Sequence, residues 1–208
     1  SLSSGKSNII EVRGLYRKFA GFYALENVSF DVKQGEILGF LGPNGAGKTT
    51  TMRIITGYLA PSRGSVTVAG MDVVMDAIET KRKMGYLPEN VAIYPEMRVI
   101  EYLKFRGRLK GIWGKKLRAR IAEIVPLCGL TDYTSKIIGT LSKGLKQRVG
   151  FAESLIHDPE ILILDEPTIG LDPSQIRQVR ELIKNLAPSK TIVLSSHILS
   201  EIENLCDK

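Results

Sequence analysis

Residues 37–50 read Ile37-Leu38-Gly39-Phe40-Leu41-Gly42-Pro43-Asn44-Gly45-Ala46-Gly47-Lys48-Thr49-Thr50, and this stretch decides the fold of the 208-residue chain. Its first five residues form an apolar run that predicts a buried strand. Gly42 to Thr49 then has the spacing Gly-x4-Gly-Lys-Thr. From Lys48 to Thr56 the length and composition predict a helix, which Gly57 closes. A strand, a glycine-rich loop and a helix in this order predict an α/β fold with a phosphate-binding loop.

The chemistry of this loop points to a nucleoside triphosphate. Its glycines let successive backbone N–H groups converge on phosphate oxygens, and the positive end of the following helix adds to the attraction. Lys48 would reach the β- and γ-phosphates, and Thr49 would place its hydroxyl on Mg²⁺. The predicted ATP-binding residues here are Gly42, Pro43, Asn44, Gly45, Ala46, Gly47, Lys48, Thr49 and Thr50.

A second buried strand ends in two carboxylates. The continuous apolar run Ile161 to Leu164 predicts a central strand covered on both faces, and Asp165 and Glu166 follow it directly. Open α/β sheets bind their ligands at this edge. We expect Asp165 to hold Mg²⁺, directly or through water. Glu166 would orient and deprotonate an attacking water as the general base.

Composition predicts one globular domain. Hydrophobic residues make up 43% and charged residues 25%. No stretch approaches the roughly 18 apolar residues of a membrane helix. Residues 1–8 lack the apolar segment of a secretory signal and are expected to be a disordered tail or an expression scar. The two cysteines, Cys128 and Cys206, form no CxxC pattern, which argues against a disulfide framework or a zinc site and fits a reducing cytoplasm.

The net charge of +7 is compatible with nucleic acid, an anionic membrane surface or a nucleotide as ligand. Much of it lies between Lys104 and Arg120. This cationic run is either a solvated helical face or a site for a protein or lipid partner.

Periodicity predicts alternating strands and helices. Strands are expected at 9–12, 25–32, 37–41, 66–69, 84–87, 161–164 and 191–194, with a Gly-Phe-Tyr loop before the second. Helices are expected at 48–56, 76–83, 145–156, from Asp172-Pro173 onward and at 200–206, with a helical stretch from 99 to about 130 that Pro126 ends or kinks.

From about residue 9 to its end, the chain resembles the nucleotide-binding domain of ATP-binding cassette (ABC) proteins. The most specific likeness is Leu141-Ser142-Lys143-Gly144-Leu145, similar to the family signature Leu-Ser-Gly-Gly-Gln. In the family this segment binds the γ-phosphate held by the opposite subunit, so hydrolysis needs a dimer. Ser142 and Gly144 keep the hydroxyl and the close backbone approach. Lys143 and Leu145 depart from the pattern, and Lys143 either faces solvent or adds a cation near the partner's nucleotide.

The resemblance assigns four more residues. Phe19 would stack on adenine, with Tyr16 and Tyr23 as competitors and a core aromatic as the alternative. Glu89 stands where the family usually has glutamine, and its carboxylate can still ligate Mg²⁺. Asp172 belongs to the loop that passes between the two sites, a role compatible with a helix N-cap. His197 would contact the γ-phosphate and orient the water.

The implied fold is a P-loop NTPase (RecA-like) core with a small antiparallel β lobe and an inserted α-helical subdomain. Residues 9–208 would form a single ABC ATPase domain with the helical subdomain at about 94–156. The chain stops early for this family at Lys208, so we expect a truncated C-terminus.

The implied function is that of the ATP-binding and hydrolysing subunit of a bacterial or archaeal exporter-like (ABC-2 type) transporter. It would act as a homodimer or heterodimer with a separate permease that docks near Glu89 and the helical insert. Its place would be the cytoplasmic face of the cell membrane. An ABC ATPase that acts on nucleic acid or the ribosome is the alternative, and a P-loop kinase is a third. The short segment between Lys48 and Ser142 leaves no room for a long coiled coil, so nucleic acid is the less expected partner.

Overall fold

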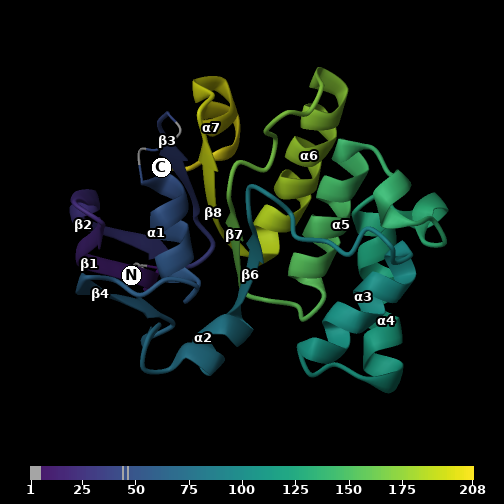
Figure 1. Ribbon diagram of the computed structural model, residues 1–208, viewed down its shortest axis with the longest axis horizontal. Helices are drawn as coiled ribbons and strands as arrows, with labels where there is room; N and C mark the ends of the chain where they lie inside the picture. The colour runs from purple at the N-terminus through teal and green to yellow at the C-terminus, as the bar shows by residue number, and fades with distance from the viewer. Residues whose placement is uncertain (1–5, 44, 46) are drawn as a thin grey trace, which may run out of the picture.

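The computed structural model describes residues 6–43, 45 and 47–208 (Figure 1). Asn44 and Ala46, two of the predicted phosphate-loop residues, lie outside the described residues. The strands are β1 Asn8–Phe19, β2 Phe22–Lys33, β3 Ile37–Leu41, β4 Arg63–Val68, β5 Met71–Asp72, β6 Met84–Leu87, β7 Ile161–Leu164 and β8 Thr191–Ser196. The helices are α1 Lys48–Ile55, α2 Ala77–Lys83, α3 Val99–Leu109, α4 Gly114–Leu127, α5 Lys143–Leu155, α6 Pro173–Leu186 and α7 Leu199–Leu205. Short 3₁₀ turns lie at Thr131–Tyr133, Ile138–Thr140 and Ala187–Ser189.

The parallel sheet has the strand order β3-β8-β7-β6, with β7 inside it. Side chains alternate along β7 between two hydrophobic cores. Ile161 and Ile163 pack into the core that α1 shares with the antiparallel strands. Leu162 and Leu164 pack into the core that contains α3 to α6. This confirms the prediction of a central strand covered on both faces, because a strand between two apolar cores has no solvated side.

The antiparallel sheet, in the order β2-β1-β4-β5, corrects two sequence-based expectations. β1 is far longer than predicted, and β2 begins earlier than predicted. The expected Gly-Phe-Tyr loop is therefore wrong, because Phe22 and Tyr23 already belong to β2. The pairing of β1 with β2 shifts register between Val12 and Leu15, and Gly14 between them has φ +53°. Such a bulge interrupts the period-two alternation by which strands are recognised.

The disordered tail predicted for residues 1–8 includes residues that the structure places in or beside the antiparallel sheet. β1 begins at Asn8, and the carbonyl of Ser7 accepts a hydrogen bond from the backbone N–H of Gln34 at 3.0 Å. Residues 7 and 8 are therefore held by the sheet.

Figure 1 shows α1 between the antiparallel strands and the parallel sheet, with α5 and α6 on the opposite side and α3 and α4 outermost. The helix limits lie close to the predicted ones. Pro126 falls in the last turn of α4, which ends one residue later, and α5 begins at Lys143, two residues earlier than expected. Together the sheets and helices confirm the predicted α/β fold class. In the part of the chain that the structure describes, no helix is both long and apolar enough to cross a membrane.

Candidate functional site

The carboxyl ends of three parallel strands meet at one edge of the sheet. Leu41 of β3 lies beside Ser196 of β8, and Leu164 of β7 lies beside Leu194 of β8. The segments that follow these strand ends carry the predicted functional side chains. The edge therefore gathers residues from three distant parts of the sequence, as the α/β rule predicts.

The loop after β3 is shaped by glycine. Gly45 and Gly47 have φ angles of +85° and +88°, which side chains with a Cβ rarely adopt. A Cβ at Gly47 would lie 2.7 Å from Cδ2 of Leu25 and 2.8 Å from the carbonyl oxygen of Ala24. Immediately after it, α1 begins at Lys48 and directs its unpaired N–H groups toward the loop. This arrangement suits an anion at the helix N-terminus.

Lys48, Glu166 and His197 form one chain of polar contacts. The Nζ of Lys48 lies 2.6 Å from Oε1 of Glu166 and also donates to the carbonyl oxygen of Gly42. The Nδ1 of His197 lies 3.0 Å from Oε2 of the same glutamate. The side chain of Glu166 is 2% exposed, whereas that of His197 is 43% exposed. The carboxylate is thus enclosed between a buried cation and an imidazole that solvent or a ligand can reach.

Both the charge and the backbone of Glu166 are unusual. Burial acts to raise its pKa, but the hydrogen bonds from Lys48 and His197 outweigh burial and hold the pKa below its ordinary value. The carboxylate is therefore ionised at neutral pH. Its backbone has φ +48°, a left-handed conformation that costs a non-glycine residue of order 1–3 kcal/mol and clusters at functional sites. Its N–H donates to Oγ of Ser195 at 2.9 Å, which helps to fix this conformation.

Asp165 and Thr49 bring a carboxylate and a hydroxyl together beside this chain of contacts. The Oγ1 of Thr49 donates to Oδ2 of Asp165 at 2.7 Å, and Oγ of Ser195 donates to Oδ1 at 2.8 Å. Hard oxygen atoms of this kind are the ligands that Mg²⁺ prefers. Glu89, the third predicted metal ligand, has no hydrogen bond or ion pair within the described residues.

The segment around Ser142 is satisfied within its own chain. Ser142 is exposed and caps α5, its Oγ accepting from the N–H of Leu145 at 3.2 Å. The space beside Gly144 is taken by the side chain of Gln175, and the amine of Lys143 lies against Gly170. Over the described residues, no hydrogen bond or ion pair joins this segment to Lys48 or Glu166. The structure brings together the residues at the sheet edge but not the signature segment with them.

Asp172 and Phe19 lie on the periphery. Asp172 caps α6, where its Oδ1 accepts from the N–H of Gln175 at 2.9 Å, as the helix N-cap reading predicts. Phe19 ends β1 and is half-buried, with the guanidinium of Arg17 4.6 Å from its ring centroid. One face of this ring is thus covered by a cation. Pro43 and Thr50 lie in the loop and in the first turn of α1 and make no side-chain hydrogen bond within the described residues.

Three residues at the site escaped the sequence analysis. Ser195 donates to Asp165 and accepts from the N–H of Glu166. It could have been found by extending the pairing of β7 with β8 by one residue, which sets Ser195 opposite Asp165. Gln147 of α5 donates to the carbonyl of Pro167 at 2.8 Å, and the buried Glu201 accepts from Thr168 and Ser196 at 2.7 Å each. Local sequence offers no signal for contacts of this kind between distant segments.

The chain is similar in sequence to ATP-binding proteins of known transporters. The chain is 41% identical over 203 residues to the bacitracin transport ATP-binding protein BcrA of Bacillus licheniformis, covering 97% of this chain and 65% of that protein. It is 42% identical over 186 residues to the ABC transporter ATP-binding protein NatA of Bacillus subtilis, covering 88% and 76%.

A solved structure is also similar. It is the dimeric, post-hydrolysis state of the ATP-binding cassette MJ0796 bound to ADP and Pi, with a TM-score of 0.83 and 26% identity over 94% of this chain and 90% of that one. The ABC transporter family model matches residues 25–169, which include the phosphate loop, the signature segment and both carboxylates. The chain therefore belongs to the ABC transporter family.

Proposed function

We propose that this chain is the ATP-binding and hydrolysing subunit of an ABC-2-type exporter. The observation that carries the proposal is the contact chain from Lys48 through Glu166 to His197, at the end of a glycine-shaped loop. It places a cation for phosphate and an imidazole each within hydrogen-bonding distance of the same ionised carboxylate. The relatives support transport by their names, and none of those reported above supports the alternative of an ATPase that acts on nucleic acid.

The resting ion pair has a mechanistic consequence. When ATP enters, its β- and γ-phosphates compete with Glu166 for the ammonium group of Lys48. Release of this hydrogen bond leaves the carboxylate free to accept a proton from water as the water oxygen attacks the γ-phosphorus. The bond from the γ-phosphorus to the bridging oxygen then breaks, and ADP keeps its electron pair. His197, which already contacts Glu166, is placed to orient the water and to stabilise charge on the γ-phosphate.

The pair Thr49 and Asp165 fits a magnesium ion. Hydroxyl and carboxylate oxygens are the hard ligands that Mg²⁺ prefers. The hydroxyl and carboxylate oxygens are 2.7 Å apart in the structure. A bound Mg²⁺ would neutralise charge on the phosphate oxygens, and Thr49 and Asp165 would hold it, Asp165 directly or through water. Glu89 could join this set after a movement of the segment that follows β6.

A second copy or a homologous subunit would complete the site. Ser142 is exposed at the N-terminus of α5, and its hydroxyl is available to a phosphate that approaches along the helix axis. The solved cassette MJ0796 is dimeric, which supports this arrangement. Closing of two subunits on ATP and their release after hydrolysis would supply the mechanical stroke.

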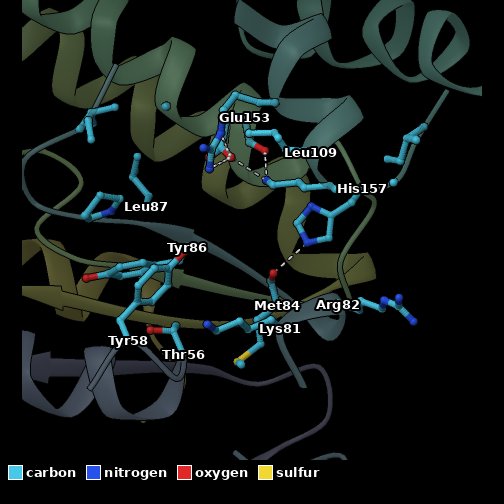
Figure 2. Close-up of a pocket in the computed structure, with 18 of the residues that line it drawn as sticks. Thr56, Tyr58, Lys81, Arg82, Met84, Tyr86, Leu87, Leu109, Glu153 and His157 are labelled. Carbon is cyan, nitrogen blue, oxygen red and sulfur yellow. Dashed lines mark hydrogen bonds and ion pairs between the residues drawn. The ribbon is translucent and has the colours of Figure 1, made fainter. Parts of the chain in front are cut away.

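The permease would dock at a cavity of about 1000 Å³ between α2, β6 and the helices α3 and α5. Pro88, Asn90 and Val91, which flank Glu89, line it together with Tyr58 and Tyr86. Figure 2 shows Tyr58 and Tyr86 side by side in this cavity and His157 directed at the carbonyl of Met84. A segment seated here would lie next to Glu89 and sense the nucleotide site through it. The subunit would then work at the cytoplasmic face of the membrane.

The test is hydrolysis by Glu166→Gln. Glutamine fills the same space but does not accept the proton, so steady phosphate release should fall by at least about 10²-fold while ATP still binds. Glu160→Gln is the matched control, because Glu160 is an exposed carboxylate just before the same strand, paired with Lys83 at the surface. Undiminished hydrolysis by Glu166→Gln would rule out Glu166 as the base. Removal of Mg²⁺ with a chelator should stop hydrolysis by the unmodified protein.

A further inference from the structure

The cationic run noted in the sequence forms an exposed corner where α3 turns into α4. We call the residues Arg108 to Arg118 the α3–α4 corner. Its exposed apolar members are Leu109 and Trp113, each 63% exposed. Its exposed cations are Arg108, Lys115, Lys116 and Arg118. A solvent-exposed tryptophan and leucine among four cations make this surface amphipathic. It is therefore not the purely polar, solvated helical face that was one reading of the cationic run.

The exposed cations of the α3–α4 corner form no ion pair among the residues that the structure describes. Within the described residues, none of its four exposed cations forms a salt bridge, whereas Lys110 within the corner and Arg106 just before it are half-buried and both pair with Glu153. The guanidinium of Arg108 lies 5.9 Å from the Trp113 ring. The corner therefore presents free positive charge together with an aromatic ring.

A second exposed apolar group lies across the docking cavity from the corner. Val74, Met75 and Ile78 precede or belong to α2, and Met75 is 84% exposed. Ile78 and Lys81 line one side of the cavity, and Leu109 and Lys116 line the other. Figure 1 places α2 and the turn between α3 and α4 at the same lower end of the molecule. Apolar side chains and cations thus border the cavity on both sides.

This combination matches the interface of an anionic bilayer. Lysine and arginine near such a surface attract phosphate headgroups, and tryptophan is favoured at the depth of the headgroups. A single-stranded nucleic acid would use the phosphate attraction and a ring face but would give no role to Met75, Ile78 and Leu109. Aliphatic side chains gain free energy when they leave water for the acyl boundary.

We propose that the α3–α4 corner binds anionic phospholipid headgroups, with the exposed side chains before and within α2 as the other contact. The proposed orientation turns both the α3–α4 corner and the docking cavity toward the membrane. This orientation rests on the proposed permease docking. Binding to lipid itself needs no permease. It can be measured with the purified chain and protein-free vesicles.

Trp113 is the only tryptophan of the chain and serves as the probe. On addition of phosphatidylglycerol-containing vesicles its fluorescence should shift to shorter wavelength and become protected from a water-soluble quencher. Vesicles of phosphatidylcholine alone should leave the spectrum unchanged. Added salt should reverse the shift, because screening weakens the attraction between the corner and the headgroups.

Variants locate the contact. The double change Lys115→Ala and Arg118→Ala removes two exposed cations that do not line the cavity, and partition into anionic vesicles should fall about fivefold for each residue. The control, Lys136→Ala with Arg177→Ala, removes the same charge from the loop before Ile138 and from α6, and its partition should stay unchanged.

Three results would overturn the proposal: an equal loss in both double variants, an unchanged spectrum with anionic vesicles, or an equal shift with RNA. ATP hydrolysis by the same preparations tests the proposed function separately, so failure of one leaves the other standing.

Discussion

The edge of the parallel sheet and the start of α5 are both predicted parts of one ATP site, yet they differ in how complete they are. At the sheet edge, Lys48, Glu166 and His197 come from three segments and already touch. At the start of α5, Ser142 satisfies only its own helix, and Gly144 is covered by Gln175. The first region is assembled by folding alone. The start of α5 is a well-capped helix end. Among the described residues, the exposed hydroxyl of Ser142 contacts no group of the sheet edge.

The difference lies in what fixes each region. Parallel strands in register bring their ends together, so the sheet edge is a consequence of the fold. Nothing in the described chain carries Ser142 to the phosphate loop. The proposed second subunit would give a role to the serine that this helix N-terminus exposes to solvent.

The largest expected effect is on the sheet edge. Lys48→Ala removes the cation that phosphate and Glu166 share, so hydrolysis should fall by about 10³-fold or more and ATP affinity should drop with it. Phosphate release measures hydrolysis, and binding of a fluorescent ATP analogue measures ATP affinity. Lys33→Ala, an exposed lysine at the end of β2, is the control. Normal ATP affinity in Lys48→Ala would show that the glycine-shaped loop does not place Lys48 on the phosphates.

The substitution Ser142→Asp separates the role of Ser142 as the N-cap of α5 from its proposed role in binding phosphate. Aspartate is as good an N-cap as serine, so Ser142→Asp should keep the thermal stability of the fold. Its carboxylate would repel the partner's phosphates, and hydrolysis should fall by about 10²-fold. Calorimetry and phosphate release are compared for the same samples. A stable Ser142→Asp protein with full activity would contradict a phosphate-binding role for this helix end.

The smallest expected effect concerns a contact away from both regions, between the far end of α5 and the first residue of β6. His157 follows α5, and its Nε2 lies 2.8 Å from the carbonyl of Met84 on β6. Burial, with a contribution from Lys110, lowers its pKa to about 4 from an ordinary 6.5. Between these values the unfolded chain binds a proton that the folded chain does not, so folding stability decreases as pH falls.

From pH 7 to pH 5 this contribution amounts to about 2 kcal/mol. Glutamine can donate to the same carbonyl without titrating. The stability difference between His157→Gln and the unmodified protein, from urea unfolding at both pH values, should therefore change by about this amount. An identical pH dependence in both proteins would show that His157 is not the group that titrates.

Sequence predicted the sheet edge well and its surroundings poorly, for physical reasons. Lys48, Asp165 and Glu166 follow apolar runs whose ends must meet in a parallel sheet, so pattern and spacing were sufficient. The bulge at Gly14 was not predictable, because it breaks the alternation that identifies a strand. Contacts such as Gln147 with Pro167, or Glu153 with Arg106 and Lys110, join residues far apart in the chain. Their side chains look like ordinary surface residues until packing brings them together.

The most direct test of the central claim is the mass of the Glu166→Gln protein in solution with Mg²⁺ and ATP. If the site is completed by Ser142 of a second subunit, sedimentation should give a dimer with ATP and a monomer with ADP. The double variant Glu166→Gln with Ser142→Asp should stay monomeric in both. A Glu166→Gln protein that binds ATP and remains monomeric would contradict the account.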